Sequence, residues 1–385
     1  MRNIALLLLG CFALFSCDQG SGSTIASPSR VIQFVYTSDA HYGLTRNFRG
    51  KNNVSAQVVN QAMITRMNAL QRLMFPEDGG VKAGDSIGAF DFVAMTGDVG
   101  NRSLTQDGIQ SAAISWSQFA TDYIAGITLH DSTGAVVPLY LAPGNHDINN
   151  AIGFYEMMTP SKDATILAEM YNRTMNPATP VTASTYEYAT MRIHYSQNIG
   201  GIHFAFINIW PDSTELGWLA ADLAAVSASM PVVIFAHDPP EVESSHFTNP
   251  NGNHGFTVTD GFENLLDMFA SGTLSTDAAL VEQRRFVAFL KAHTNIKAYF
   301  HGHDNGNEYY KYKGPDDDVA LRTFRVDSPM KGSASELDAS KLSFQVVSID
   351  STLKQMTVRE CLWNSNSATT LSPLVWGTVY SMSLR

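Results

Sequence analysis

The chain has 385 residues, of which 44% are hydrophobic, so it can bury a large core and is long enough for two or three average domains. Its formal net charge of −11 argues against a nucleic-acid partner, which would require a basic face. The charge does not exclude a phosphate substrate, because bound divalent cations would reverse the local field in a cleft.

The first 29 residues have the pattern of an export signal followed by a tether. An apolar run at residues 4–15 is too short to span a membrane as a helix. Residues 1–17 end in a segment similar to a bacterial lipobox, so we expect a signal peptide and a lipid anchor to a membrane at Cys17. The polar residues 18–29 are typical of a flexible tether. The alternative is a plain secretory peptide cut near Ser23, and both alternatives place the protein in the bacterial cell envelope, periplasmic or at the surface.

The rest of the chain alternates between strand-like and helix-like runs. Apolar spacing predicts helices at residues 54–75, 112–127, 216–226 and 280–292. Strands are predicted at residues 31–37, 92–96, 137–142, 203–209, 231–236, 297–300, 324–326, 342–349 and 356–361. The last three alternate apolar and polar residues, as half-exposed strands do. We expect residues 151–188 to form a helical insertion near the mouth of a cleft and residues 241–260 a surface loop beside it.

Five of the predicted strands are followed directly by short polar segments. These segments are Asp39-Ala40-His41, Gly97-Asp98-Val99-Gly100-Asn101-Arg102, Gly144-Asn145-His146-Asp147, Ala236-His237-Asp238 and His301-Gly302-His303-Asp304-Asn305. Because ligands bind at the carboxyl ends of strands in open α/β sheets, we expect these side chains to meet at one edge of a sheet. Their carboxylate, amide and imidazole groups suit borderline-hard divalent metal ions.

In this order, the five segments resemble the motifs D-x-H, G-D-x-x-[DN], G-N-H-[DE], H and G-H-x-H of the calcineurin-like metallophosphoesterases. The resemblance extends from about residue 31 to residue 303. It implies an α/β fold, the four-layer α/β/β/α sandwich of that family. Since the motifs span most of the chain, we interpret residues 30–385 as a single metallophosphoesterase domain with insertions near residues 151–188 and 241–262.

The resemblance also implies a binuclear metal centre. Two divalent or trivalent ions, manganese, iron or zinc, would share the carboxylate of Asp98. Asp39 and His41 would complete the site of the first ion, and the other implied ligands bind the second ion: Asn145, His237 and His303.

The last motif departs from the family pattern, because Asn305 stands where a second histidine is usual. An amide oxygen is a neutral and poor donor to zinc, so the first site would be weaker, more solvated or biased toward a harder metal such as manganese. The alternative ligand is His301, which would require the backbone to bend.

Three further residues are implied to act on the substrate. His146 would face the scissile bond and stabilise or protonate the leaving oxygen, or act only as a hydrogen-bond donor. Arg102 would bind phosphate, or else form a surface salt bridge. Asn101 replaces the aspartate that supports the catalytic histidine in related phosphatases, so a charged pair with His146 is in doubt. The remaining candidates are expected to be a solvated basic loop (Arg46, Arg49, Lys51) and structural or exposed histidines (His194, His203, His246, His254, His293).

These patterns predict a metal-dependent phosphoric ester hydrolase that acts outside the cytoplasm on a small phosphate ester, by in-line attack of a metal-bound hydroxide. The first alternative is a phosphodiesterase on cyclic nucleotides or lipid headgroups rather than a monoesterase. The second is a catalytically weak binding lipoprotein. The sequence makes no prediction about the substrate, the metal or the oligomeric state.

Overall fold

The computed structural model of the protein describes residues 30–103, 110–148, 163–247, 263, 265–268, 278–365 and 374–385. The predicted signal segment, Cys17 and the tether lie outside these residues, as do residues 151–162 and 248–262 of the two predicted insertions. Within the described part of the chain, no helix combines the length and hydrophobicity that a membrane span requires.

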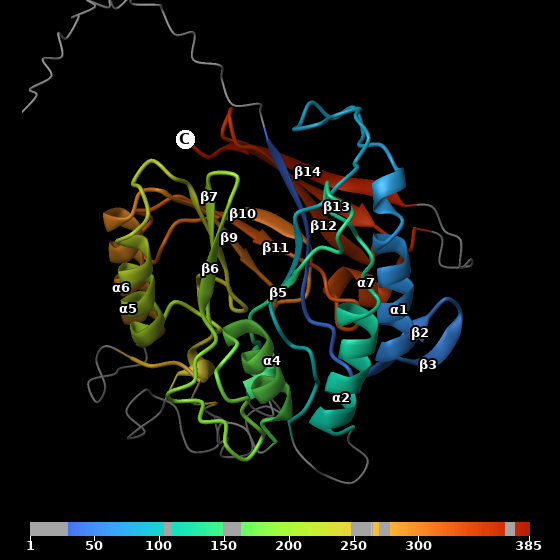
Figure 1. The fold of residues 1–385 in the computed structure, drawn as a ribbon, viewed down its shortest axis with the longest axis horizontal. Helices are drawn as coiled ribbons and strands as arrows, with labels where there is room; N and C mark the ends of the chain where they lie inside the picture. Colours follow the sequence, from blue (N-terminus) through green and yellow to red (C-terminus); the bar gives the residue numbers. More distant parts are fainter. Residues whose placement is uncertain are drawn as a thin grey trace, which may run out of the picture.

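Two six-stranded sheets form the centre of the fold (Figure 1). The first has the order β14-β13-β12-β1-β4-β5 and consists of β1 (Val31–Thr37), β4 (Phe92–Met95), β5 (Leu139–Leu141), β12 (Ser343–Asp350), β13 (Gln355–Leu362) and β14 (Val375–Ser383). The second has the order β10-β11-β9-β8-β7-β6 and consists of β6 (Tyr195–Ile199), β7 (Ile202–Phe206), β8 (Val232–Phe235), β9 (Ile296–His301), β10 (Glu308–Tyr312) and β11 (Leu321–Arg325). A separate two-stranded ribbon pairs β2 (Thr45–Phe48) with β3 (Lys51–Ser55).

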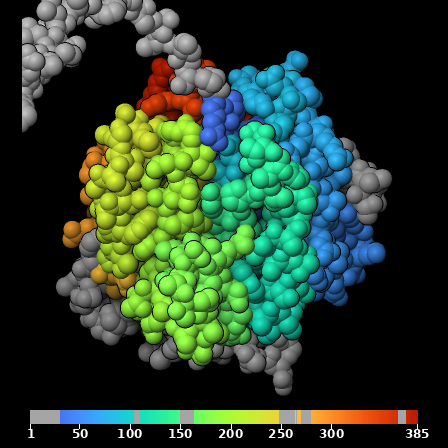
Figure 2. Space-filling view, in the orientation of Figure 1, coloured from blue at the N-terminus to red at the C-terminus, as the bar shows by residue number. Residues whose placement is uncertain are grey.

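Helices cover the outer faces of both sheets. Figure 1 shows α5 and α6 beside the second sheet and α1, α2 and α7 beside the first, which is the predicted α/β/β/α sandwich. The helices are α1 (Ala56–Met67), α2 (Ala112–Phe119), α3 (Asn145–Ile148), α4 (Thr165–Met175), α5 (Ser213–Leu223), α6 (Ala278–Ala292) and α7 (Ser333–Leu337). In the space-filling view, α4 lies against α2 on the face shown (Figure 2).

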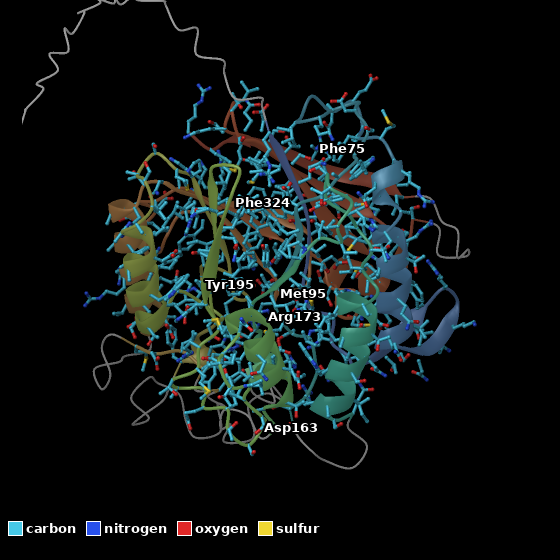
Figure 3. The ribbon with its side chains drawn as sticks, viewed as in Figure 1. Phe75, Met95, Asp163, Arg173, Tyr195 and Phe324 are labelled. Carbon is cyan, nitrogen blue, oxygen red and sulfur yellow. The ribbon has the colours of Figure 1, made fainter. Side chains whose placement is uncertain are left out.

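Strand alternation divides the core into two sides. On β1, Phe34 and Tyr36 join the aromatic layer between the sheets, whereas Val35 joins the cluster on the helix side. Phe34 stacks on Phe92 with ring centroids 4.5 Å apart, and Phe324 belongs to the same layer (Figure 3). Because these strands are buried on both faces, their sequences are nearly continuous hydrophobic runs.

Two local predictions were wrong. Strands β12 and β13 are almost wholly buried rather than half-exposed, since they too lie between the other sheet and the helices. The helix predicted at residues 54–75 ends at Met67, and Val58 and Met74 are 50% and 56% exposed. Val58 and the adjacent Val59 cannot both face the core, because neighbouring residues on a helix point about 100° apart. Val59 is buried, and Val58 is therefore exposed.

The direction of the strands positions the polar segments. β1, β4 and β5 are mutually parallel, and β7, β8, β9 and β11 are mutually parallel. The carboxyl ends of each set therefore meet at one edge of its sheet, and the polar segments follow β1, β4, β5, β8 and β9 at those edges.

Candidate metal centre

The loops that carry the predicted ligands have unusual backbone conformations. The φ angle is positive at five non-glycine positions of the motifs: Asp39 (58°), His41 (44°), Asp98 (51°), His303 (66°) and Asn305 (51°). Left-handed conformations cost about 1–2 kcal/mol per residue and are retained where the surrounding structure fixes them, typically at functional sites. These turns aim successive side chains back toward the edge of the sheets.

Glycines let the motif loops approach one another. A Cβ atom at Gly97 would lie 2.0 Å from the backbone nitrogen of Gly144, and one at Gly302 would lie 2.2 Å from Oδ2 of Asp39. Backbone hydrogen bonds join the loops after β1 and β4, from the Asp39 nitrogen to the Gly97 oxygen (3.0 Å) and from the His41 nitrogen to the Asp98 oxygen (2.9 Å). The glycines of the motifs are therefore required for packing the loops.

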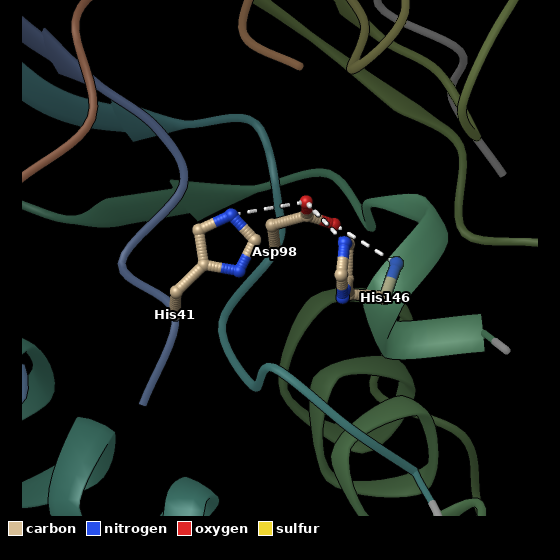
Figure 4. A group of neighbouring side chains, drawn as sticks. All are labelled: His41, Asp98 and His146. Atoms are coloured by element: carbon tan, nitrogen blue, oxygen red, sulfur yellow. Dashed lines mark hydrogen bonds and ion pairs between the residues drawn. The ribbon is translucent and has the colours of Figure 1, made fainter. Parts of the chain in front are cut away.

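Asp39, His41 and Asp98 form the first group of donors. His41 Nε2 lies 3.5 Å from Asp98 Oδ2 (Figure 4). It lies 3.7 Å from Asp39 Oδ1, and all three side chains are buried. Asp39 Oδ1 and both ring nitrogens of His41 have no hydrogen-bond partner among the residues that the structure describes. Buried polar atoms are rarely left unpaired, so these atoms fit a bound cation.

His237 is the centre of the second group. Its Nε2 lies 3.4 Å from Asp98 Oδ1, 3.1 Å from Asn145 Oδ1 and 3.3 Å from His303 Nδ1. Donor atoms about 2.1 Å from a shared ion lie roughly 3.0–3.4 Å apart at right-angle or tetrahedral geometry. The spacing therefore fits one ion held by four side chains, with Asp98 shared between the two groups.

Each donor of the second group is oriented by an outer partner. His237 donates from Nδ1 to the Thr96 carbonyl oxygen at 2.6 Å, so Nε2 is the ring nitrogen that faces the group. His303 Nε2 is 2.9 Å from Glu243 Oε2, and Asn145 donates from Nδ2 to Glu263 Oε2 at 3.3 Å. Such partners fix the tautomer or amide orientation of metal ligands.

The charges of the two groups perturb one another. Burial raises the pKa of Asp39 to about 6. Burial alone would lower the pKa of His237, but the charge of Asp98 outweighs it and raises that pKa to about 10. The pKa of His41 is well below its usual value because the ring is buried. The carboxylates of Asp39 and Asp98 are buried close together, so bound cations would stabilise their negative charge.

His146, the predicted acid, lies beside the first group. Its Nε2 is 3.9 Å from Asp98 Oδ2, and its backbone nitrogen donates to Asp98 Oδ1 at 3.0 Å (Figure 4). Its Nδ1 donates to the backbone carbonyl of Asn101 at 2.8 Å, so the carbonyl and not the Asn101 side chain orients the ring. Arg102 Nη1 lies 3.4 Å from Nδ1 of His146. Burial lowers the pKa of His146 to about 3, so the ring is neutral and an acid role would require Nε2 first to take up a proton.

Asn305 and His301 differ in their surroundings. Asn305 Nδ2 donates to the His303 carbonyl. Its buried Oδ1 has no hydrogen-bond partner within the described residues, as expected of an oxygen that binds a metal ion. Both ring nitrogens of His301 face other groups, with Nδ1 2.9 Å from the Gly302 oxygen and Nε2 3.2 Å from the Tyr310 hydroxyl. The structure therefore does not bring His301 to the donor groups.

Several residues around the centre were missed by the sequence interpretation. Glu243 and Glu263 hold second-group ligands, and His246 is buried beside them, donating from Nδ1 to Asp238 Oδ2 at 2.6 Å. His246 is buried rather than exposed, its Nε2 has no hydrogen-bond partner among the described residues, and Glu243, Ser245 and His246 do not belong to a simple surface loop. The spacing of Glu243 and His246, three residues apart and soon after His237, is the signal that could have identified them.

Two basic residues also occupy unexpected places. Lys331, which follows β11, has Nζ 3.1 Å from His146 Nε2. Arg46 is buried rather than solvated, and its Nη1 donates to the Pro329 carbonyl at 2.6 Å. Arg49 lies over the Phe48 ring and donates to Asn364, away from the donor groups.

The chain is similar to known proteins in sequence and in fold. The sequence model described as calcineurin-like phosphoesterase matches residues 32–307, well over half of the chain. No curated protein sequence matches the chain. Three solved structures are similar over most of the chain: a dimetal phosphatase from Danio rerio (9% identity, TM-score 0.48, 86% of this chain and 95% of that one), the calcineurin-like phosphoesterase YfkN from Bacillus subtilis (10%, 0.30, 93% and 92%) and the phosphopantetheinyl hydrolase PptH from Mycobacterium tuberculosis (12%, 0.32, 77% and 90%).

Proposed function

The chain belongs to the calcineurin-like phosphoesterase family, and on this premise we propose that it is a binuclear metal-dependent hydrolase of phosphate esters. The observation that carries the proposal is the pair of buried donor groups that share the Asp98 carboxylate. One group presents oxygen and nitrogen atoms that have no hydrogen-bond partner in the described part of the chain, and the other has the spacing of ligands around one ion.

Asp39, His41 and Asp98, with Asn305, would hold the first ion, and Asp98, Asn145, His237 and His303 would hold the second. Two divalent cations at these positions would supply positive charge to the phosphate and activate water for in-line attack on phosphorus. Manganese, iron and zinc all accept this mixture of oxygen and nitrogen donors, with a harder ion such as manganese favoured where Asn305 replaces a histidine.

The chain's other residues would position the ester. His146 lies between the Asp98 carboxylate and Arg102, where it would contact the leaving-group oxygen. The guanidinium of Arg102 would bind a non-bridging phosphate oxygen. Burial of the carboxylates and imidazoles excludes bulk water and so strengthens their electrostatic effect on the phosphate.

We also propose that the protein is exported and anchored by a lipid at Cys17. The support is the amino-terminal sequence, in which a short apolar run leads to a lipobox-like segment and a polar tether.

The direct test uses purified protein with p-nitrophenyl phosphate and its bis-ester, before and after chelation and with added Mn²⁺. We expect hydrolysis that chelation abolishes and Mn²⁺ restores, together with two ions per chain by elemental analysis. Preference for one ester separates a monoesterase from a diesterase. Two bound ions without hydrolysis of either ester would favour a binding protein, and a failure to bind ions would refute the proposal.

A further inference from the structure

The segment after β11 is tied to the metal centre at several points. The Ser328 hydroxyl donates to the Asp39 carbonyl at 2.8 Å and accepts from the backbone nitrogens of Met330 (3.1 Å) and Lys331 (3.0 Å). The backbone nitrogen of Ser333 donates to the Asn305 carbonyl at 2.7 Å. This segment is therefore fixed against two loops that carry predicted ligands of the first ion.

A buried arginine holds the same segment from its other side. The Arg46 guanidinium donates from Nη1 to the Pro329 carbonyl at 2.6 Å and from Nη2 to the Ser335 carbonyl. The buried carboxylate of Asp327 accepts from the Ser335 hydroxyl at 3.3 Å. Hydrogen bonds hold the backbone on both sides of Lys331, so the position of its Cα atom is fixed.

Lys331 extends from this segment to the predicted catalytic histidine. Because His146 Nδ1 donates to the Asn101 carbonyl, His146 Nε2 is the acceptor for the Lys331 ammonium at 3.1 Å. An ammonium has three donors, and the other two on Lys331 have no hydrogen-bond acceptor in the part of the chain that the structure describes. Lys331 is half-buried, and burial lowers its pKa while Asp98 and Asp39 oppose the shift.

Two cations therefore flank the His146 ring, with Arg102 at Nδ1 and Lys331 at Nε2. Ions bound to the carboxylates of Asp98 and Asp39 would neutralise the negative charge that now acts on the Lys331 ammonium. The ammonium would then retain its free donors for an anion that enters beside His146. A tetrahedral oxyanion with several acceptor oxygens fits this arrangement.

We propose that Lys331 is a further catalytic residue, which donates hydrogen bonds to a non-bridging oxygen of the phosphoryl group and keeps the His146 ring in place. This inference rests on the proposed function. Its ligand class is a phosphate monoester or diester and the product of its hydrolysis, which is inorganic phosphate from a monoester and a phosphate monoester from a diester. The same ammonium would serve substrate and product, so its removal weakens both.

The test compares Lys331→Met and Lys331→Arg with a matched control, Lys311→Met, in which an exposed lysine of β10 is lost. Inorganic phosphate is titrated calorimetrically into the Mn²⁺-loaded full chain, and kcat and KM are measured with p-nitrophenyl phosphate. Lys331→Met should bind phosphate roughly 10- to 100-fold more weakly, the scale of a hydrogen bond to a charged group, with its ion content unchanged. Lys331→Arg should recover most of that affinity, and the control should match the wild type.

Phosphate affinity and kcat/KM within twofold of the wild type in Lys331→Met would overturn the inference. Loss of bound ions in both Lys331 variants would also overturn it, because Lys331 would then act on the metal centre rather than on the phosphate. Lys331→Gln replaces Lys331→Met if the latter does not fold. If the wild type binds ions and phosphate but hydrolyses no ester, the proposed function fails while weaker phosphate binding by Lys331→Met still supports the assigned contact.

Discussion

Asp98→Asn is the most informative single substitution, because one carboxylate serves both donor groups. Oδ1 accepts from the His146 backbone nitrogen and faces His237, and Oδ2 faces His41. The amide keeps the shape of the side chain but removes its charge and replaces one acceptor oxygen with a donor. The variant therefore tests the charge of the bridge with little change in packing.

The size of the effect follows from the separation of the charges. At 3.4 Å and an effective dielectric constant of about 20, a unit charge on Asp98 interacts with protonated His237 by about 5 kcal/mol. Since one pKa unit corresponds to about 1.4 kcal/mol, the pKa of His237 in the metal-free protein should be lower by about 3.5 in Asp98→Asn. The wild-type value of about 10 would then approach neutrality.

Nuclear magnetic resonance of the histidine rings in metal-free protein measures this shift, and elemental analysis with p-nitrophenyl phosphate turnover measures its consequence. We expect Asp98→Asn to lose metal affinity by more than the 10- to 100-fold typical of outer partners, and to lose hydrolysis. Asp304→Asn is the matched control, because Asp304 lies in the fifth motif but pairs with Arg325. Near-normal activity with two bound ions in Asp98→Asn would refute the shared-ligand arrangement.

Three further predictions rest on the same geometry, and a fourth rests on the amino-terminal sequence. His146→Ala should retain both ions while turnover falls roughly a hundredfold, with a smaller loss for esters that have acidic leaving groups; equal losses would remove His146 from the acid role. Asn305→His should hold the first ion more tightly and need less added Mn²⁺ for full activity, at a modest cost in stability; an unchanged requirement would exclude Asn305 as a ligand. Asp98 raises the pKa of His237 to about 10 in the metal-free protein, so an entering ion must displace a proton from that ring. Metal affinity measured by titration should therefore rise with pH, by up to about tenfold per pH unit below that pKa. A metal affinity that does not change with pH would contradict the protonation of His237. Cys17→Ser should release the protein from the membrane fraction or leave it unprocessed, and normal processing with unchanged membrane association would contradict lipidation.

The sequence predicted the fold and the position of each polar segment at the end of a strand, because both depend on local patterns. Each motif follows a hydrophobic strand, and parallel strands bring their carboxyl ends to one edge whatever the loops between them contain. The family assignment and the four-layer sandwich were therefore confirmed by the family match and by the sheets and helices.

The residues that the sequence did not reveal act through long-range contacts. Lys331 follows β11, and only the parallel pairing of β11 with β9 shows that this strand also ends at the edge with the motifs. Arg46 contacts Pro329 across nearly 300 residues of chain, and no periodicity predicts such a pair. Glu263 accepts a hydrogen bond from Asn145 and lies just beyond the predicted loop at residues 241–260, where no motif marks it.

The atoms that make the centre competent for metal binding also make it costly to fold without metal. Asp39 and His41 bury polar atoms that have no hydrogen-bond partner among the described residues, and each unsatisfied buried polar atom costs about 1–3 kcal/mol. The left-handed turns at the motif residues add a further cost at the same place. The Ser328 and Arg46 hydrogen bonds offset part of it by holding the loops from outside. Because these outer contacts do not involve the predicted donor atoms, the loops can keep their shape when ions leave, and the donors then remain preorganised for the next ions.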